Sequence, residues 1–295
     1  MTTSLSEARG SAASVDPVPI RHKHSIGTVV SKTLLAIFGF VFFIPFIWMF
    51  LTSLKPSMEV LLGGADPFGS SIVWSNYQNV FTSIPFGRIL LNTFFIAGVG
   101  AGIAVLVSVL NAYAFARLKF PGRSVLFFIL VATLMLPVEV LVIPLFIGAN
   151  ELGMINTYSA VILPFAFGAF GTFLLREFLL SLPADYEEAA RIDGASQFQL
   201  LWHVIVPLLR GPISIVGAFA FIDYWNNFLW PLIIITDPSK APLQLGLSMF
   251  SGERGTDWGP LMAACSVAVL ASLVIVILMQ RQLAKGINIG GFGGK

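Results

Sequence analysis

The sequence predicts an all-α polytopic membrane protein with about six transmembrane helices. Of its 295 residues, 56% are hydrophobic and only 11% are charged, whereas soluble domains carry about 25% charged residues. So few charges could not cover a surface that faces water. Most of the chain is therefore expected to face hydrocarbon or other helices.

Apolar runs of sufficient length predict where the spans lie. A helix that crosses the hydrocarbon core needs about 20 predominantly apolar residues. Four runs have no charge in their interior, and two others hold one carboxylate each, Glu139 or Asp223. The predicted spans are 33–54, 89–116, 124–150, 152–176, 211–236 and 258–280.

The distribution of Lys and Arg predicts the orientation of the spans, because cytoplasmic loops carry the excess of basic residues. An even number of spans puts both termini on one side, and that side holds thirteen basic residues. The other side holds three, with Arg88 at a boundary. Both termini are therefore predicted to be cytoplasmic.

The chain divides into three segments. Residues 1–30 are rich in Ser, Ala and Pro and lack apolar periodicity, so they are predicted to form a flexible cytoplasmic tail. Residues 31–284 form the predicted transmembrane domain, which includes a cytoplasmic loop at 181–210. Residues 285–295 are predicted to form a cytoplasmic C-terminal tail.

Two longer connections are predicted on the external side, at 55–87 and 237–257. Within the first, Asn76 to Phe81 is predicted to form a short amphipathic helix at the membrane surface. Both connections are candidate docking surfaces for an extracytoplasmic partner, and simple linkage of the spans is the alternative.

The cytoplasmic loop is predicted to contain two short helices about a glycine. Asp185 follows Pro183 at a suitable helix start, and Glu187 and Glu188 suit the positive end of the helix dipole. Gly194 can adopt the left-handed conformation that ends a helix.

The second helix of the loop is predicted to begin at a Ser196 cap and to stop at Pro207. Its apolar side chains recur at helical spacing, at Phe198, Leu201, Trp202 and Ile205. Such a helix pair could form a rigid knob for a soluble partner, or it could lie flat among lipid headgroups.

The motif Glu188-Ala189-Ala190, followed by Gly194 and Pro207, resembles the EAA loop of permeases from ATP-binding-cassette importers. The segment from Ala189 to Ala195 is similar to the version in carbohydrate importers of the maltose-permease type. Further resemblances run along the chain beyond the tail, whereas residues 285–295 depart from the family pattern. The segments that resemble the family include Ser53–Pro56, Asn92-Thr93, Ala112–Arg117, Ile143–Leu145 and Trp225–Asn227.

This resemblance implies a type I importer permease fold and a subunit that moves a carbohydrate or related polyol into the cytoplasm. It also implies that the loop couples the permease to an ATPase. The residues implied in that coupling are Glu187, Glu188, Ala189, Ala190, Asp193, Gly194, Ala195, Phe198 and Pro207.

The chain contains no Gly-x-x-x-x-Gly-Lys-Ser/Thr, the motif that holds nucleotide phosphates. The chain is therefore predicted not to be an enzyme and to carry no cofactor, with ATP and Mg²⁺ bound on a partner. The resemblance implies two ATPase subunits, a second homologous permease in a heterodimer and an extracytoplasmic solute-binding protein. The net charge of +2 does not indicate a nucleic-acid partner.

Polar residues inside apolar spans are candidates for the substrate path, because charge within a membrane is costly. Aromatic rings and amides beside Asp223 would suit sugar stacking and hydrogen bonding, or they could serve interhelical packing. The candidates are Glu139, Asp223, Tyr224, Trp225, Asn226 and Asn227. Asn92 and the pair Gly98 and Gly102 are predicted to serve helix packing.

An ion-coupled secondary transporter is the alternative function. It would need a coupling site built from membrane carboxylates, which Glu139 and Asp223 could supply. It would have no use for an EAA-type loop.

Overall fold

The computed structural model describes residues 26–63, 66, 69–252 and 255–289. The chain forms two compact units, residues 1–45 and 46–295, and each is described by itself. Helix α1 (Ile26–Ser53) supplies the described part of the first unit. The predicted tail lies outside the described residues up to residue 25, and residues 26–30 already belong to α1.

The second unit is almost entirely helical. Its first half contains α2 (Ser57–Leu61), α3 (Ser75–Ser83), α4 (Phe86–Arg117), α5 (Arg123–Ala132), η1 (Thr133–Met135), α6 (Val138–Glu151), α7 (Tyr158–Ile162), η2 (Leu163–Phe165) and α8 (Ala169–Ser181). Its second half contains α9 (Asp185–Ile192), α10 (Gln197–Gln199), the π-helical η3 (Leu200–Ile205), α11 (Val206–Leu208), α12 (Arg210–Asn226), α13 (Leu229–Ile234), η4 (Pro238–Lys240), α14 (Leu243–Ser248) and α15 (Trp258–Ile289). Strands β1 (Ser251–Gly252) and β2 (Gly255–Thr256) pair as a small antiparallel hairpin.

Three described helices are long and apolar enough to cross a membrane, at Val30–Ser53, Phe86–Arg117 and Trp258–Leu278. Three further pairs of helices reach that length only together and are bent by more than 40° at a break. The count of about six spans therefore holds when each bent pair is one span.

The predicted span 124–150 is broken between η1 and α6, where the axis turns by 107°. Pro137 disfavours helical geometry for the residue before it, and Leu136 is accordingly extended, with ψ 119°. Proline also supplies no N–H to continue the helix. Residues 124–150 therefore form two short helices.

The predicted span 152–176 begins later than expected, at Tyr158, and ends later, at Ser181. Gly153 and Asn156 both take positive φ, 64° and 62°, so the chain turns sharply after α6. Glycine and asparagine are the residues that best tolerate this left-handed geometry.

The predicted span 211–236 is also interrupted, because α12 ends at Asn226 after 17 residues. Asn227 is extended, with ψ 121°, before α13 begins. A continuous helix would place the ring of Pro231 against the carbonyl of Asn227, four residues earlier. The break in the helix relieves that clash.

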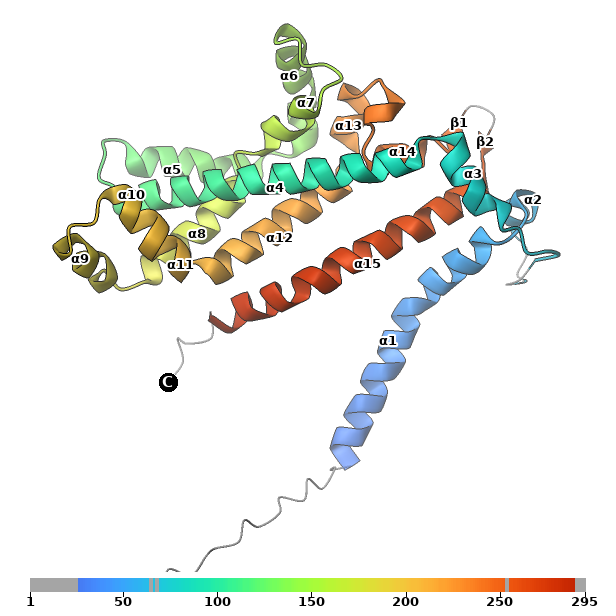
Figure 1. Cartoon of the computed structure of the whole chain (residues 1–295), viewed down its shortest axis with the longest axis horizontal. Helices are drawn as coiled ribbons and strands as arrows, with labels where there is room; N and C mark the ends of the chain where they lie inside the picture. Colours follow the sequence, from blue (N-terminus) through green and yellow to red (C-terminus); the bar gives the residue numbers. More distant parts are fainter. Residues whose placement is uncertain (1–25, 64–65, 67–68, 253–254, 290–295) are drawn as a thin grey trace, which may run out of the picture. The chain divides into compact units, whose positions relative to one another are not determined.

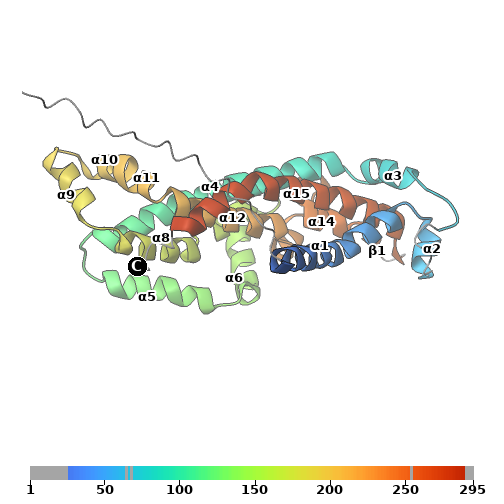
Figure 2. The same ribbon diagram turned by 90° about the horizontal axis from the view of Figure 1, so that it is seen from below.

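Helix α4 runs along the second unit and packs against α8 and α12 (Figures 1 and 2). Glycines allow the close approach on both sides. A Cβ atom on Gly100 would lie 2.6 Å from the ring of Tyr224, and one on Gly171 would lie 2.4 Å from Ser108 Oγ. The prediction that Gly98 and Gly102 pack closely is wrong within this chain, because a Cβ on either meets nothing within 4 Å.

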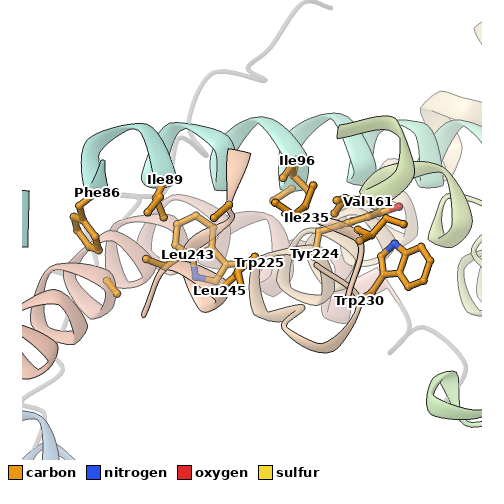
Figure 3. Close-up of a cluster of buried hydrophobic side chains, with 14 of the residues drawn as sticks. Phe86, Ile89, Ile96, Val161, Tyr224, Trp225, Trp230, Ile235, Leu243 and Leu245 are labelled. Atoms are coloured by element: carbon orange, nitrogen blue, oxygen red, sulfur yellow. The ribbon is translucent and has the colours of Figure 1, made fainter. Parts of the chain in front are cut away.

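A buried cluster, which we call the distal core, joins the first half of α4 to α7, α12, α13, α14 and α15. Figure 3 shows Ile89 and Ile96 on α4 facing this cluster. The indole of Trp230 donates to the Ala160 carbonyl at 2.8 Å, so its one polar group is satisfied.

Asn92 confirms its predicted role in helix packing. Its amide donates to the carbonyls of Ser239 at 2.9 Å and Ala241 at 3.1 Å, and its oxygen accepts from the Tyr158 hydroxyl at 2.9 Å. One side chain thereby joins α4 to α7 and η4.

The short helix predicted at Asn76 to Phe81 is present as α3, but it is partly enclosed by protein. Val80 and Asn76 are buried, and α3 packs against α15. The Asn76 amide donates to the carbonyls of Ser53 at 2.8 Å and Lys55 at 2.9 Å. The burial of Asn76 shows that α3 packs against the rest of the protein and does not only lie at the membrane surface.

We expect Gly100→Ala to destabilise the fold by about 1–3 kcal/mol, because the added methyl group overlaps the Tyr224 ring. Gly98→Ala is the matched control on the same helix and should be neutral or slightly stabilising. Thermal unfolding of the purified chain in detergent would measure both. Equal melting temperatures for the two variants would contradict this account of α4 packing.

Candidate functional site: a helical hairpin and a cleft

A hairpin of two helical arms, residues 185–208, lies at one end of the second unit (Figure 1). We call this segment the hairpin. The end of α8 leads into it, and α12 follows it after a bend of 80°. Basic residues gather at this end of the unit, at Arg117, Lys119, Arg123, Arg176, Arg191 and Arg210.

The turn of the hairpin has the predicted glycine geometry. Gly194 takes φ 81°, and its N–H donates to the Arg191 carbonyl at 3.0 Å. The N–H of Ala195 reaches back to the Ala190 carbonyl, also at 3.0 Å. These two bonds satisfy the last carbonyls of α9 and end it sharply.

The second arm begins with a complete capping box. The Gln199 N–H donates to Ser196 Oγ at 3.4 Å, and the Ser196 N–H donates to the Gln199 side chain at 2.8 Å. This arm ends at Leu208, one residue beyond the stop predicted at Pro207. Because Pro207 has no N–H for the His203 carbonyl, the α-helical bonding pattern is interrupted there, next to the π-helical stretch.

The apolar residues of the second arm divide between two environments. Leu201 and Ile205, with Leu200, are buried against α4 and α8 in a cluster that we call the hairpin-side core. Phe198 is 72% exposed and Trp202 is also exposed. The same arm thus anchors the hairpin and presents apolar side chains outward.

The first arm adds to the outward apolar surface. Ile192 is 86% exposed at the tip, and Tyr186 is exposed near the start of α9. Exposed apolar side chains on a protrusion are candidates for an interaction site. We call Tyr186, Ile192, Phe198 and Trp202 the apolar tip.

A buried ion pair joins the hairpin to its base. Glu187 is 5% exposed at its side chain and accepts a hydrogen bond from Nε of Arg117, which is 15% exposed. Nη2 of Arg117 donates to the carbonyls of Leu179 at 2.9 Å and Leu182 at 3.1 Å. Arg191 lies 3.5 Å from the other Glu187 oxygen.

The predicted coupling residues therefore differ in accessibility. Glu188, Ala189, Asp193, Gly194 and Phe198 are exposed; Ala190, Ala195 and Pro207 are half-buried; Glu187 alone is buried. Arg117 was missed as a site residue because a charge at a span boundary is already explained by membrane orientation. Its place at the end of the family-like segment Ala112–Arg117 was the available clue.

A cleft of about 570 Å³ lies between α4, α8 and α12. Its walls are mostly apolar and include Phe170 and Phe219, with polar groups from Ser108, Asp223 and Asn226. An apolar pocket with a few polar groups is the usual form of a small-molecule site. Of the predicted path residues, Asp223, Tyr224 and Asn226 line this cleft.

The aromatic rings beside Asp223 lie in the protein interior, as Figure 3 shows. The Tyr224 hydroxyl donates to the Ile162 carbonyl at 2.7 Å. Trp225 packs between Phe94 and Phe221, with ring centroids 5.1 and 5.9 Å away. This arrangement favours interhelical packing over sugar stacking for these two rings.

The two remaining candidates, Glu139 and Asn227, lie apart from a common site. Glu139 is exposed in the first turn of α6, where a negative charge suits the helix dipole. Asn227 forms the break after α12, and neither it nor Glu139 lines the cleft. Among the described residues, no group of three or more His, Cys, Asp or Glu could hold a metal ion.

Helices that cross the membrane, a cleft between them and a protruding hairpin define a membrane-transport subunit. A family profile described as "Binding-protein-dependent transport system inner membrane component" matches residues 104–289. The chain belongs to this family, which confirms the resemblance drawn from the EAA-type loop. It is a multi-pass permease of an importer.

Individual relatives agree with the family. The chain is 34% identical over 246 residues to the sn-glycerol-3-phosphate transport system permease protein UgpE of Pectobacterium atrosepticum, covering 81% of this chain and 88% of the relative. It is 32% identical over 269 residues to the diacetylchitobiose uptake system permease protein NgcG of Streptomyces coelicolor, covering 89% of this chain and 88% of the relative.

The fold is similar to that of a chain in the crystal structure of a bacterial ABC transporter involved in the import of the acidic polysaccharide alginate. The TM-score is 0.74 at 25% sequence identity, covering 88% of this chain and 97% of that one. The predicted fold class, an all-α importer permease, is thereby confirmed.

We expect Glu187→Ala to destabilise the subunit by roughly 3 kcal/mol, because it leaves a largely buried Arg117 without its ionic partner. Glu188→Ala, one residue along and exposed, should change stability by less than about 0.5 kcal/mol. Thermal unfolding of the two purified variants would compare them. Similar losses of stability at both positions would show that the ion pair between Glu187 and Arg117 contributes no more than an exposed side chain does.

Proposed function

We propose that this permease imports a carbohydrate or related polyol and is driven by ATP that a separate subunit hydrolyses. The hairpin carries this proposal: its apolar tip is exposed while its base is buried in the hairpin-side core. An exposed apolar knob on a rigid base suits a groove in a soluble partner. The lack of a phosphate-binding motif in the chain agrees with an ATPase on another subunit.

The proposed assembly contains two ATPase subunits, which bind ATP and Mg²⁺, and a second homologous permease that completes a heterodimer. An extracytoplasmic solute-binding protein delivers the solute, in keeping with the name of the family. Closure of the ATPase subunits would move the hairpin as a lever and reorient the membrane helices. This chain itself needs no cofactor in that scheme.

We place both termini and the hairpin in the cytoplasm. Six basic residues of the second unit lie at the hairpin end, and this asymmetry matches the rule that basic residues stay on the cytoplasmic side. Lys55 and Lys240 lie in connections at the opposite ends of the helices. The regions 55–87 and 237–257 would then face the solute-binding protein.

The cleft is this subunit's proposed contribution to the solute path. The Asp223 carboxylate can accept hydrogen bonds from solute hydroxyl groups, and the Asn226 amide can both donate and accept. The apolar walls, which include Phe170 and Phe219, suit the C–H faces of a sugar ring. The names of the two relatives, which mention sn-glycerol-3-phosphate and diacetylchitobiose, support this solute class.

The alternative, an ion-coupled secondary transporter, is less well supported. It requires Glu139 and Asp223 to act in one coupling site. Asp223 lines the cleft on α12, whereas Glu139 lies in the first turn of α6 and is absent from the cleft lining. The two carboxylates do not share a site in the described part of the chain.

Purification of this subunit from its native membrane should recover a Walker-motif ATPase with it. In vesicles that contain the purified complex and a solute-binding protein, uptake of labelled disaccharide should require ATP and persist when ionophores collapse ion gradients. Complexes with an ATPase variant that cannot hydrolyse ATP provide the control. Uptake that needs an ion gradient and no ATPase would contradict the proposal.

We expect Ile192→Ser and Phe198→Ser each to weaken ATPase binding at least tenfold, since both remove exposed apolar contacts from the hairpin. Leu152→Ser is the matched control, because Leu152 is 74% exposed but lies outside the hairpin. Retention of the ATPase on the purified permease in increasing salt and detergent would measure the effect. Equal retention in all three variants would show that the apolar tip is not the docking surface.

A further inference from the structure

The last turn of α4 holds both arms of the hairpin. Tyr113 and Arg117 are four residues apart on α4, so their side chains lie on one face of the helix. Tyr113 reaches Gln197, which opens the second arm, and Arg117 reaches Glu187 in the first arm. Two polar contacts one turn apart thus connect a membrane helix to each arm.

The Arg117 side chain is largely buried and has several hydrogen-bond partners. Its guanidinium binds Glu187 of α9 and also the carbonyls of Leu179 and Leu182, where α8 ends. Charge-assisted bonds of this kind are shorter and stronger than neutral ones. The end of α8, the start of α9 and the end of α4 therefore share one side chain.

The Tyr113 contact fixes the other arm. The residue is 6% exposed, and its hydroxyl donates to the side-chain oxygen of Gln197. Gln197 directly follows Ser196, the residue that caps this arm. The bond therefore acts at the start of the second arm, close to the turn at Gly194.

Helix α4 connects these contacts directly to the cleft. Ser108 and Ala104, which line the cleft, lie on the same uninterrupted helix. Arg117 is about 14 Å along the axis from Ser108, at about 1.5 Å per residue. Ser108 packs closely on Gly171, and Gly100 on Tyr224, so a displacement of α4 must move the walls of the cleft.

We propose that Tyr113 and Arg117 are positioning residues that transmit motion of the hairpin to α4 and so to the cleft. This inference rests on the proposed function, in which an ATPase moves the hairpin. Apolar contacts through Leu200, Leu201 and Ile205 also join the hairpin to α4 and α8, but such contacts are non-directional. The two polar contacts set the register of each arm against α4.

The test measures ATP hydrolysed per solute imported by the complete complex in vesicles. Tyr113→Phe removes one hydroxyl, and Glu187→Gln removes the charge while keeping an acceptor for Arg117. Tyr158→Phe is the matched control for the first, because Tyr158 bonds to Asn92 at the other end of α4. Glu177→Gln is the control for the second, because Glu177 forms an exposed ion pair with Arg176.

We expect Tyr113→Phe and Glu187→Gln to raise the ratio of ATP to solute at least about fivefold, the lower end of typical coupling effects. The two controls should leave it unchanged. Loss of stability alone would lower the amount of assembled complex without changing this ratio. If Glu187→Gln does not assemble, Tyr113→Phe decides the outcome.

An unchanged ratio in Tyr113→Phe, or an equal rise in Tyr158→Phe, would overturn the proposed linkage. An unchanged ratio in Tyr113→Phe would show that the Tyr113 contact does not transmit motion. An equal rise in Tyr158→Phe would show that any loosening of α4 raises the ratio of ATP to solute. Failure of the proposed function is distinguishable, because the unaltered complex would then show no ATP-driven uptake at all.

Discussion

The close packing of α4 against α8 and α12 is the constraint on which the rest of the structure depends. Gly100 and Gly171 remove the side chains that would keep these helices apart, and Tyr224 and Ser108 fill the space. In lipid there is little hydrophobic force between helices, so van der Waals contact of this kind holds them together. The cleft, the distal core and the base of the hairpin are all arranged along α4.

The hairpin combines a fixed base with an exposed tip. Leu200, Leu201 and Ile205 belong to the hairpin-side core, whereas Ile192 and Phe198 project away from it. Local geometry at Gly194 and Ser196 shapes the turn, and a buried ion pair to Arg117 holds the first arm. A protrusion anchored in this way can pass a displacement between a soluble partner and the membrane helices.

The breaks in the predicted spans 124–150 and 211–236 follow from prolines, whose effects depend on their position. Pro137 separates α5 and η1 from α6, yet Pro144 lies within α6 without ending it. Composition cannot separate these cases, because an apolar run of the right length has the same sequence pattern whether it folds as one straight helix or as two helices joined at a bend.

The sequence by itself determined the membrane class, the distribution of charge and the turn at Gly194, since these depend on composition or on residues close together in the chain. Tertiary structure alone decided that Glu187 is buried, because its partner Arg117 lies 70 residues earlier. It also decided that Gly100, and not Gly98 or Gly102, meets a neighbouring helix. The physical reason is that faces toward lipid and faces toward other helices are both apolar, so hydrophobic periodicity cannot tell them apart.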